Sequence, residues 1–144
     1  MVTKIYTDGS GESSHIGGKF CAVFIKDETK ADEVDFVQYR ESETKLTCNE
    51  AEYHAILLAL EERKHKEKIE IISDSKLVVN QLRPVNPWNI NFEHLKILNS
   101  LVKDIIENFQ LEIELKWVPR DQNLAGLYFE GKLKVPNDKI LTEW

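Results

Sequence analysis

The sequence predicts an α/β protein in which helices flank a five-stranded mixed sheet of three antiparallel strands followed by two parallel ones. Three segments with the patterns of strands follow one another near the N-terminus with short links, as in an antiparallel meander. The apolar period then changes, and two further strands are separated by helical segments, as crossover connections require. No repeat or Gly/Ser linker interrupts the 144 residues, so we expect a single domain over 1–144, with 131–144 as a C-terminal extension.

Turn residues delimit the first three expected strands. Residues 2–8 alternate loosely and end at Asp8, directly before a glycine turn. An apolar run over 19–26 follows two glycines, and residues 33–40 alternate as a third strand. The charged segment 27–32 between them predicts a hairpin connection.

A capping box opens the first expected helix, with Thr47 as the N-cap and Glu50 three residues later. Residues 51–60 behind it are apolar on most faces, which is typical of a helix pressed into a core. Mixed charges over 61–68 indicate a solvated end of the same helix rather than a binding site.

The remaining elements are predicted from apolar periods, prolines and turn residues. They are a short strand over 69–73 that ends at Asp74, a short helix over 75–82, a loop with two prolines over 83–91, a long amphipathic helix over 92–109, and a fifth strand over 111–118 followed by a short helix. The extension has weak periodicity, so it either packs Leu141 and Trp144 on the body or forms a tail.

Composition excludes several classes of protein. Apolar residues make up 42% and charged residues 31% of the chain, so wholesale disorder is not expected. The apolar runs are too short to cross a membrane, and the first residues show no signal core. Two cysteines, Cys21 and Cys48, make no disulfide framework or metal-ligand set, which predicts a cytoplasmic protein. With 25 acidic and 19 basic side chains, the net charge of −6 argues against a strongly basic nucleic-acid coat.

Three carboxylates stand at positions that suit chemistry. Asp8 and Asp74 end two strands, and ligands of open α/β sheets bind beyond strand ends where the strand order switches. Glu52 borders an apolar helix, where an unpaired acid is costly to bury and a divalent cation would remove that cost. Taken singly, Asp8 and Asp74 could be turn residues or helix caps, and Glu52 could pair with a lysine. Together the three favour a metal site.

Oxygen ligands alone favour Mg²⁺ or Mn²⁺ over Zn²⁺. Two such ions roughly 3.5–4 Å apart can activate a water and stabilise the leaving oxygen when a phosphodiester is hydrolysed. We therefore expect two Mg²⁺ or Mn²⁺ ions, held by Asp8, Glu52 and Asp74.

Around these acids the sequence resembles the ribonuclease H family, from about residue 3 to residue 130. The matching segments are Ile5-Tyr6-Thr7-Asp8-Gly9-Ser10, Thr47-Cys48-Asn49-Glu50-Ala51-Glu52-Tyr53, Ile72-Ser73-Asp74-Ser75, Trp88 before a long helix, and Lys116-Trp117-Val118-Pro119-Arg120-Asp121-Gln122-Asn123. In the second segment the family's metal ligand is the glutamate before the aromatic residue, so the resemblance selects Glu52 over Glu50. The loop over 83–91 carries one positive charge, which resembles a short type 1 form without a basic protrusion.

The resemblance implies a ribonuclease H-like fold and a metal-dependent endonuclease that cleaves the RNA strand of RNA–DNA hybrids, leaving a 5′-phosphate and a 3′-hydroxyl. The three carboxylates would hold the ions, and we expect a monomer. Ser10, Thr47 and Asn49 would lie along the hybrid, although Thr47 could equally serve only as the helix cap. Trp88 would either stack on a sugar or base or cover the core.

The match breaks at the start of the last helix, where Gly126 stands in place of the family's fourth carboxylate. Glu130, one helical turn later, either reaches the same region as a catalytic acid or lies on the surface. The loss leaves an alternative function, that of a catalytically weak or inactive ribonuclease H-like module that still binds nucleic acid. The loop before this helix contains Arg120 and no histidine. Trp117, in the strand before that loop, is expected in the core.

Overall fold

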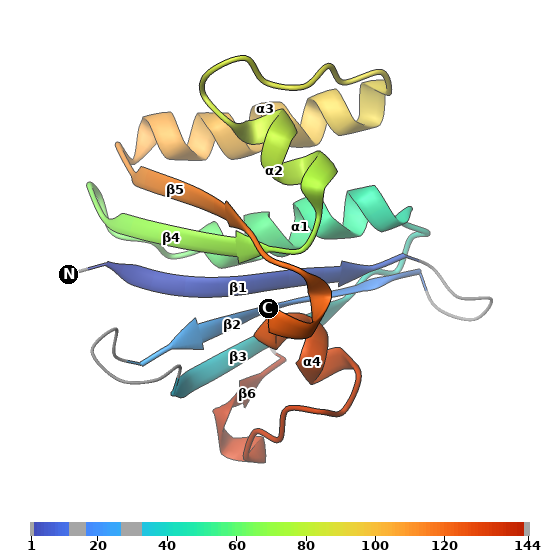
Figure 1. Cartoon of the computed structure of the whole chain (residues 1–144), viewed down its shortest axis with the longest axis vertical. Helices are drawn as coiled ribbons and strands as arrows, with labels where there is room; N and C mark the ends of the chain where they lie inside the picture. Colours follow the sequence, from blue (N-terminus) through green and yellow to red (C-terminus); the bar gives the residue numbers. More distant parts are fainter. Residues whose placement is uncertain (1, 12–16, 27–32, 143–144) are drawn as a thin grey trace.

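The computed structural model of the chain describes residues 2–11, 17–26 and 33–142, so the expected hairpin connection over 27–32 lies outside the described residues. The helices and strands follow the expected order and add one strand at the end (Figure 1). They are β1 (Thr3–Ser10), β2 (Lys19–Ile25), β3 (Val34–Glu41), α1 (Cys48–Leu60), β4 (Lys68–Ser73), α2 (Lys76–Leu82), α3 (Glu93–Asn108), β5 (Glu112–Trp117), α4 (Leu124–Phe129) and β6 (Ile140–Leu141). No helix among these residues is long and apolar enough to span a bilayer.

All the strands belong to one mixed sheet with the order β5-β4-β1-β2-β3-β6. β1, β2 and β3 pair antiparallel, whereas β4 pairs parallel to β1 and β5 parallel to β4. Among the described residues the sheet has six strands and not the expected five, because Ile140 and Leu141 pair in parallel with Val37 and Gln38. The C-terminal extension thus covers what would otherwise be a free edge of β3.

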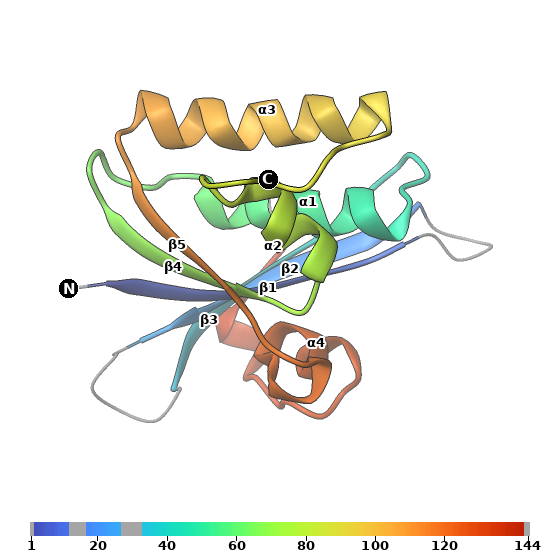
Figure 2. The same ribbon diagram turned by 45° about the horizontal axis from the view of Figure 1, so that its top comes forward.

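Helices cover both faces of the sheet (Figure 2). α1 lies between the sheet and α3, and it begins with the expected capping box. The Thr47 side chain accepts from the amide of Glu50 at 3.2 Å, and the Glu50 carboxylate accepts from the amide of Thr47 at 2.9 Å. The expected charged helix end over 61–68 is wrong, because α1 stops at Leu60. Glu62 and Lys66 adopt φ angles of 60° and 62°, which an α-helix cannot contain.

A buried polar network, which the sequence did not predict, ties three helices together. The Tyr53 hydroxyl of α1 donates to the side-chain carbonyl of Gln81 in α2 at 2.7 Å. The Asn99 amide of α3 donates to the Tyr53 hydroxyl at 3.1 Å and to the Gln81 backbone carbonyl at 3.2 Å. Because its members are buried and satisfied, the network fixes how these helices pack.

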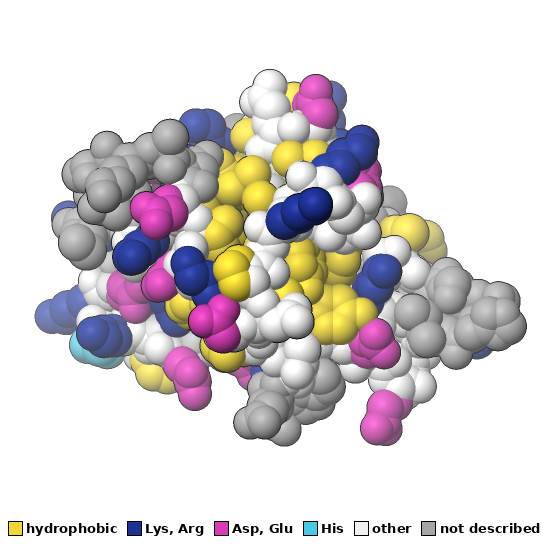
Figure 3. Space-filling model, turned by 90° about the horizontal axis from the view of Figure 1, so that it is seen from below, with side chains coloured by type: hydrophobic (Ala, Val, Ile, Leu, Met, Phe, Trp, Pro, Cys, Tyr) yellow, Lys and Arg dark blue, Asp and Glu magenta, His cyan; other side chains and the backbone are white. Residues whose placement is uncertain are grey.

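α4 and the C-terminal extension cover the opposite face of the sheet. Their apolar side chains pack on a second core that contains Tyr6, Cys21 and Ile72; they include Leu124, Tyr128, Phe129, Leu133, Val135 and Ile140. Seen from below, where β6 and α4 lie in Figure 1, apolar side chains gather between charged ones (Figure 3). The described part of the extension therefore packs on the body and is not a tail.

Candidate active site

The register of the sheet brings Asp8 and Asp74 together. Tyr6 of β1 is the partner of Ile72 in the parallel strand β4. Asp8 and Asp74 each lie two residues beyond this pair, and side chains two residues apart share one face of a sheet. β1 pairs antiparallel with β2 on its other side, so the two carboxylates lie where the sheet changes from parallel to antiparallel. This is the switch point at which the sequence predicted a ligand site.

Glu52 reaches the same place because Gly9 lets α1 approach β1 closely. A Cβ atom on Gly9 would lie 2.2 Å from the carbonyl carbon of Ala51, so no residue with a side chain fits there without movement. The amide of Gly9 donates to Oε1 of Glu52 at 2.9 Å. This hydrogen bond orients the Glu52 carboxylate at the end of β1, next to Asp8.

Asp8, Glu52 and Asp74 form an acid cluster in which one oxygen of each lies within 4.8 Å of the others. Asp8 is 1% and Glu52 9% exposed, and no described residue gives either Asp8 oxygen a hydrogen bond. Burial, and then repulsion within the cluster, raise the pKa of Asp8 to about 7 and that of Glu52 to about 9. A divalent cation would relieve both effects, and a site with oxygen donors alone fits Mg²⁺ or Mn²⁺.

In the ion-free protein we expect the acid cluster to lower stability as the pH rises. The pKa values of Asp8 and Glu52 are raised from 3.8 and 4.5, so the folded protein keeps protons that the unfolded chain releases. The stability linked to these protons is lost as the pH rises through about 7 and 9. In EDTA, Tm should fall by about 3 °C between pH 7 and pH 8.5.

The control for this prediction is Glu52→Gln, in which the fall of Tm should be smaller. The pKa of the part-buried His54 is lowered from 6.5, so its imidazole is largely neutral in both states above pH 7 and does not mask the effect. An equal fall of Tm in wild type and Glu52→Gln would contradict this origin of the pH dependence.

Two side chains hold Asp74 in position: Trp117 is the last residue of β5, and Asn123 follows that strand. The buried Asn123 caps α4 and donates from its amide to Oδ2 of Asp74 at 3.2 Å and to the carbonyl of Thr7 at 2.9 Å. The indole of Trp117 donates to the backbone carbonyl of Asp74 at 3.0 Å. The expectation that Trp117 lies in the core is wrong: it is 40% exposed, because β5 is the edge strand of the sheet. An asparagine directly before a short helix is a signal for the cap of α4, whereas nothing in the local sequence indicates its contact with Asp74.

Glu130 does not join the acid cluster, which has three members among the described residues. Its Oε1 accepts from Nε of Arg120 at 2.9 Å, and its Oε2 pairs with Nζ of Lys132 at 3.2 Å. Gly126 does lie beside the cluster, since a Cβ atom there would be 3.5 Å from Oδ2 of both Asp8 and Asp74. A fourth carboxylate at position 126 would therefore stand next to the other acids.

Three of the residues expected to contact nucleic acid lie at the ends of the two elements that carry Asp8 and Glu52. Ser10 ends β1, and Thr47 and Asn49 lie at the N-terminus of α1. Thr47 and Asn49 line a pocket of about 150 Å³ with Phe92, His94 and Leu95. Trp88, in the loop between α2 and α3, is 45% exposed and so does not cover the core. The cap bond of Thr47 is present, and its contact with nucleic acid stays a prediction.

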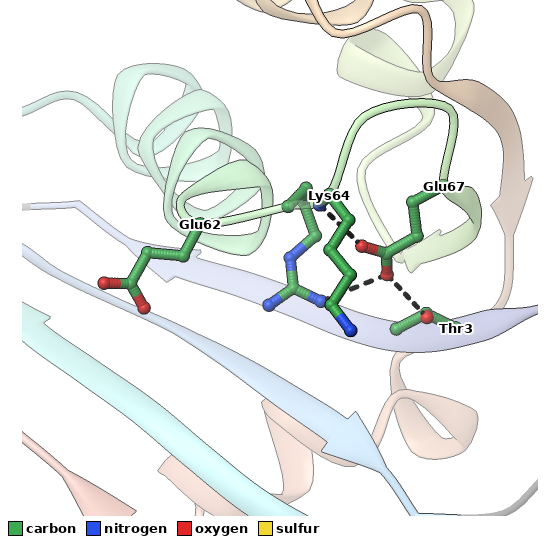
Figure 4. A pocket seen from close by; sticks show the side chains of 5 residues that line it. Thr3, Glu62, Lys64 and Glu67 are labelled. Atoms are coloured by element: carbon green, nitrogen blue, oxygen red, sulfur yellow. Dashed lines mark hydrogen bonds and ion pairs between the residues drawn. The ribbon is translucent and has the colours of Figure 1, made fainter.

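A larger pocket, of about 350 Å³, lies at the other end of β1 (Figure 4). Its Glu67 carboxylate is held by its neighbours: it accepts from the hydroxyl of Thr3 at 2.7 Å and from the amide of Lys64 at 2.9 Å, and it pairs with Arg63 at 3.3 Å. These bonds fix the turn after α1. Among the described residues, none that lines this pocket has a buried polar atom without a hydrogen-bond partner.

The fold and the acid cluster together define an α/β protein with a candidate divalent-metal site at the switch point of a mixed sheet. The family model for RNase H matches residues 2–126, which include the three acids. The chain belongs to the RNase H family. Comparison with curated proteins gives no match.

Three solved structures illustrate the shared fold, each 23% identical to this chain. RNase H1 from the halophilic archaeon Halobacterium salinarum has a TM-score of 0.71, over 87% of this chain and 91% of that one. The N-terminal RNase H domain of a Mycobacterium tuberculosis protein has a TM-score of 0.70, over 88% of both chains. LC11-RNase H1 in complex with an RNA/DNA hybrid has a TM-score of 0.69, over 84% of this chain and 88% of that one. The expected ribonuclease H-like fold is confirmed.

Proposed function

We propose that the protein is a ribonuclease H that hydrolyses the RNA strand of RNA–DNA hybrids and leaves a 5′-phosphate and a 3′-hydroxyl. The observation that carries the proposal is the acid cluster, in which β1, α1 and the end of β4 bring three carboxylate oxygens within 4.8 Å in a chain of the RNase H family. LC11-RNase H1, which shares the fold, was solved in complex with an RNA/DNA hybrid.

In this proposal Asp8, Glu52 and Asp74 hold Mg²⁺ or Mn²⁺. Bound divalent ions lower the pKa of a water and stabilise the charge on the leaving oxygen. If two ions bind, the three carboxylates would hold both, because Gly126 adds no carboxylate beside them. The chain's own contribution is orientation: the Gly9 amide fixes Glu52, and Asn123 fixes Asp74.

Ser10, Thr47, Asn49 and Trp88 are proposed to contact the hybrid. Discrimination between RNA and DNA strands requires contacts with the 2′-hydroxyl groups in the minor groove. The hydroxyl and amide groups of Ser10, Thr47 and Asn49 are suited to that hydrogen bonding, and the exposed indole of Trp88 is suited to stacking. The monomeric state and the cytoplasmic location expected from the sequence belong to the same proposal.

The experiment offers the protein three duplexes of one sequence: an RNA–DNA hybrid with label on either strand, double-stranded RNA and double-stranded DNA. With Mg²⁺ or Mn²⁺, only the RNA strand of the hybrid should be shortened, and the fragments should carry a 5′-phosphate and a 3′-hydroxyl. An uncleaved hybrid with both ions, under conditions in which a known ribonuclease H cleaves it, would overturn the proposal.

The second candidate function, a weak or inactive module that still binds nucleic acid, is favoured by Gly126 in place of a fourth carboxylate. Calorimetric titration with Mg²⁺ separates the two. An active site that holds metal should give binding heat that Asp74→Asn abolishes. A module with a broken site should bind the hybrid and give no such heat.

A further inference from the structure

The acid cluster has a cation of its own beside it. Nη2 of Arg120 lies 3.9 Å from Oδ2 of Asp8, and Nη1 lies 3.9 Å from Oδ2 of Asp74. The guanidinium thus faces two of the three carboxylates that would hold a divalent ion. These ion pairs are longer than hydrogen bonds, so a stronger cation can replace them.

Gly126 makes room for this arrangement. A Cβ atom at position 126 would lie 3.8 Å from Cγ of Arg120 and 3.5 Å from the nearest oxygens of Asp8 and Asp74. A longer side chain extending from that Cβ would enter the space between the arginine and the acids. Gly126 therefore leaves the space beside Asp8 and Asp74 open to the Arg120 guanidinium.

Glu130 holds Arg120 in this place. The Arg120 side chain is 56% exposed, so a free guanidinium would sample many rotamers and lose most of its effect on the cluster. Oε1 of Glu130 accepts from Nε of Arg120 at 2.9 Å, which leaves both Nη groups directed at Asp8 and Asp74. Lys132 pairs with the other oxygen of Glu130 at 3.2 Å and does not share a salt bridge with the acids among the described contacts.

We propose, resting on the proposed function, that Arg120 is a resident counter-cation of the acid cluster which a divalent ion bound by the cluster must displace, and that Glu130 is its positioning residue. The phosphate groups of a hybrid offer the displaced guanidinium a new partner, since planar guanidinium groups bind phosphate oxygens well. Binding of the ion and binding of the hybrid then favour each other.

The test measures Mn²⁺ binding to the metal-free full chain by calorimetry, without nucleic acid. Arg120→Met removes the guanidinium and keeps the apolar stem, whereas the matched control Lys132→Met removes the same charge from the far side of Glu130. Arg120→Met should bind Mn²⁺ about tenfold more tightly than wild type, because a cation about 4 Å from the ligands is lost. Lys132→Met should change the affinity by about twofold or less.

The role of Glu130 is tested by a double-mutant cycle. The effect of Glu130→Gln on Mn²⁺ affinity should differ by about threefold or more between wild type and Arg120→Met, because Glu130 affects the ion by positioning Arg120. In the Arg120→Met background, Glu130→Gln can only weaken Mn²⁺ binding, since one negative charge is lost.

Equal Mn²⁺ affinities for Arg120→Met and Lys132→Met, or a cycle without coupling, would overturn the inference. Mn²⁺ binding by wild type that Asp74→Asn does not weaken would also overturn it. No cleavage is measured in these titrations, so a failure of the proposed function, seen as an uncleaved hybrid, is distinguishable from a failure of the inference.

Discussion

Asp8→Asn is expected to abolish cleavage of the hybrid and, at the same time, to stabilise the ion-free protein. The substitution removes a metal ligand at the centre of the acid cluster, and the rate should fall by about 10³-fold or more. It also removes a carboxylate that is 1% exposed and has no hydrogen-bond partner among the described residues. The new amide can donate to the neighbouring carboxylates, so Tm in EDTA should rise by about 3–6 °C.

Opposite changes in activity and stability distinguish a functional acid from a structural one. The matched control is Asp104→Asn on α3, because Asp104 is exposed and lies outside the acid cluster. It should leave both the cleavage rate and Tm near wild type. A lower Tm for Asp8→Asn in EDTA, or cleavage at the wild-type rate, would contradict the assignment of Asp8.

Gly9→Ala is expected to have the largest effect on folding. The added Cβ atom would lie 2.2 Å from the carbonyl carbon and 2.3 Å from the carbonyl oxygen of Ala51, so β1 and α1 must separate. We expect a loss of about 3 kcal/mol or more, or no stable fold, because rigid backbone atoms cannot move aside as a side chain can. Urea unfolding followed by circular dichroism measures the loss.

Gly131→Ala is the control for the backbone cost of replacing a glycine. Its Cβ atom would meet nothing within 4 Å, but Gly131 has a φ of 73°. It should cost only about 1 kcal/mol. If Gly9→Ala costs no more than Gly131→Ala, the close approach of α1 to β1 does not hold the site together.

Local patterns in the sequence were enough to predict the order of the main elements and the positions of the three acids. The capping box depends on residues three apart, and the alternation of β1 depends on neighbours. Asp8 and Asp74 were predicted to share a site because ligands of open α/β sheets bind beyond strand ends where the strand order switches. The close approach of α1 to β1 at Gly9 explains why Glu52, which lies on that helix, can reach Asp8 and Asp74.

Features that depend on contacts far apart in the sequence were not predictable in this way. The sixth strand needs the extension to find the edge of β3, and its two residues carry little pattern of their own. Trp117 is a large apolar residue of the kind expected in a core, yet it lies on β5, an edge strand of the sheet, and its side chain is partly exposed. Glu130 was considered as a catalytic acid, whereas the structure pairs it with Arg120 and Lys132.

The most direct test of the proposal is whether cleavage follows the divalent ion. A hybrid with a labelled RNA strand is incubated with the protein after EDTA treatment, and again after Mn²⁺ or Mg²⁺ is added in excess. The RNA strand should stay intact in EDTA and be cleaved when the ion returns. The Asp74→Asn variant should not cleave it even after the ion is added. Cleavage that persists in EDTA, or that Asp74→Asn retains in full, would contradict an active site built on Asp8, Glu52 and Asp74.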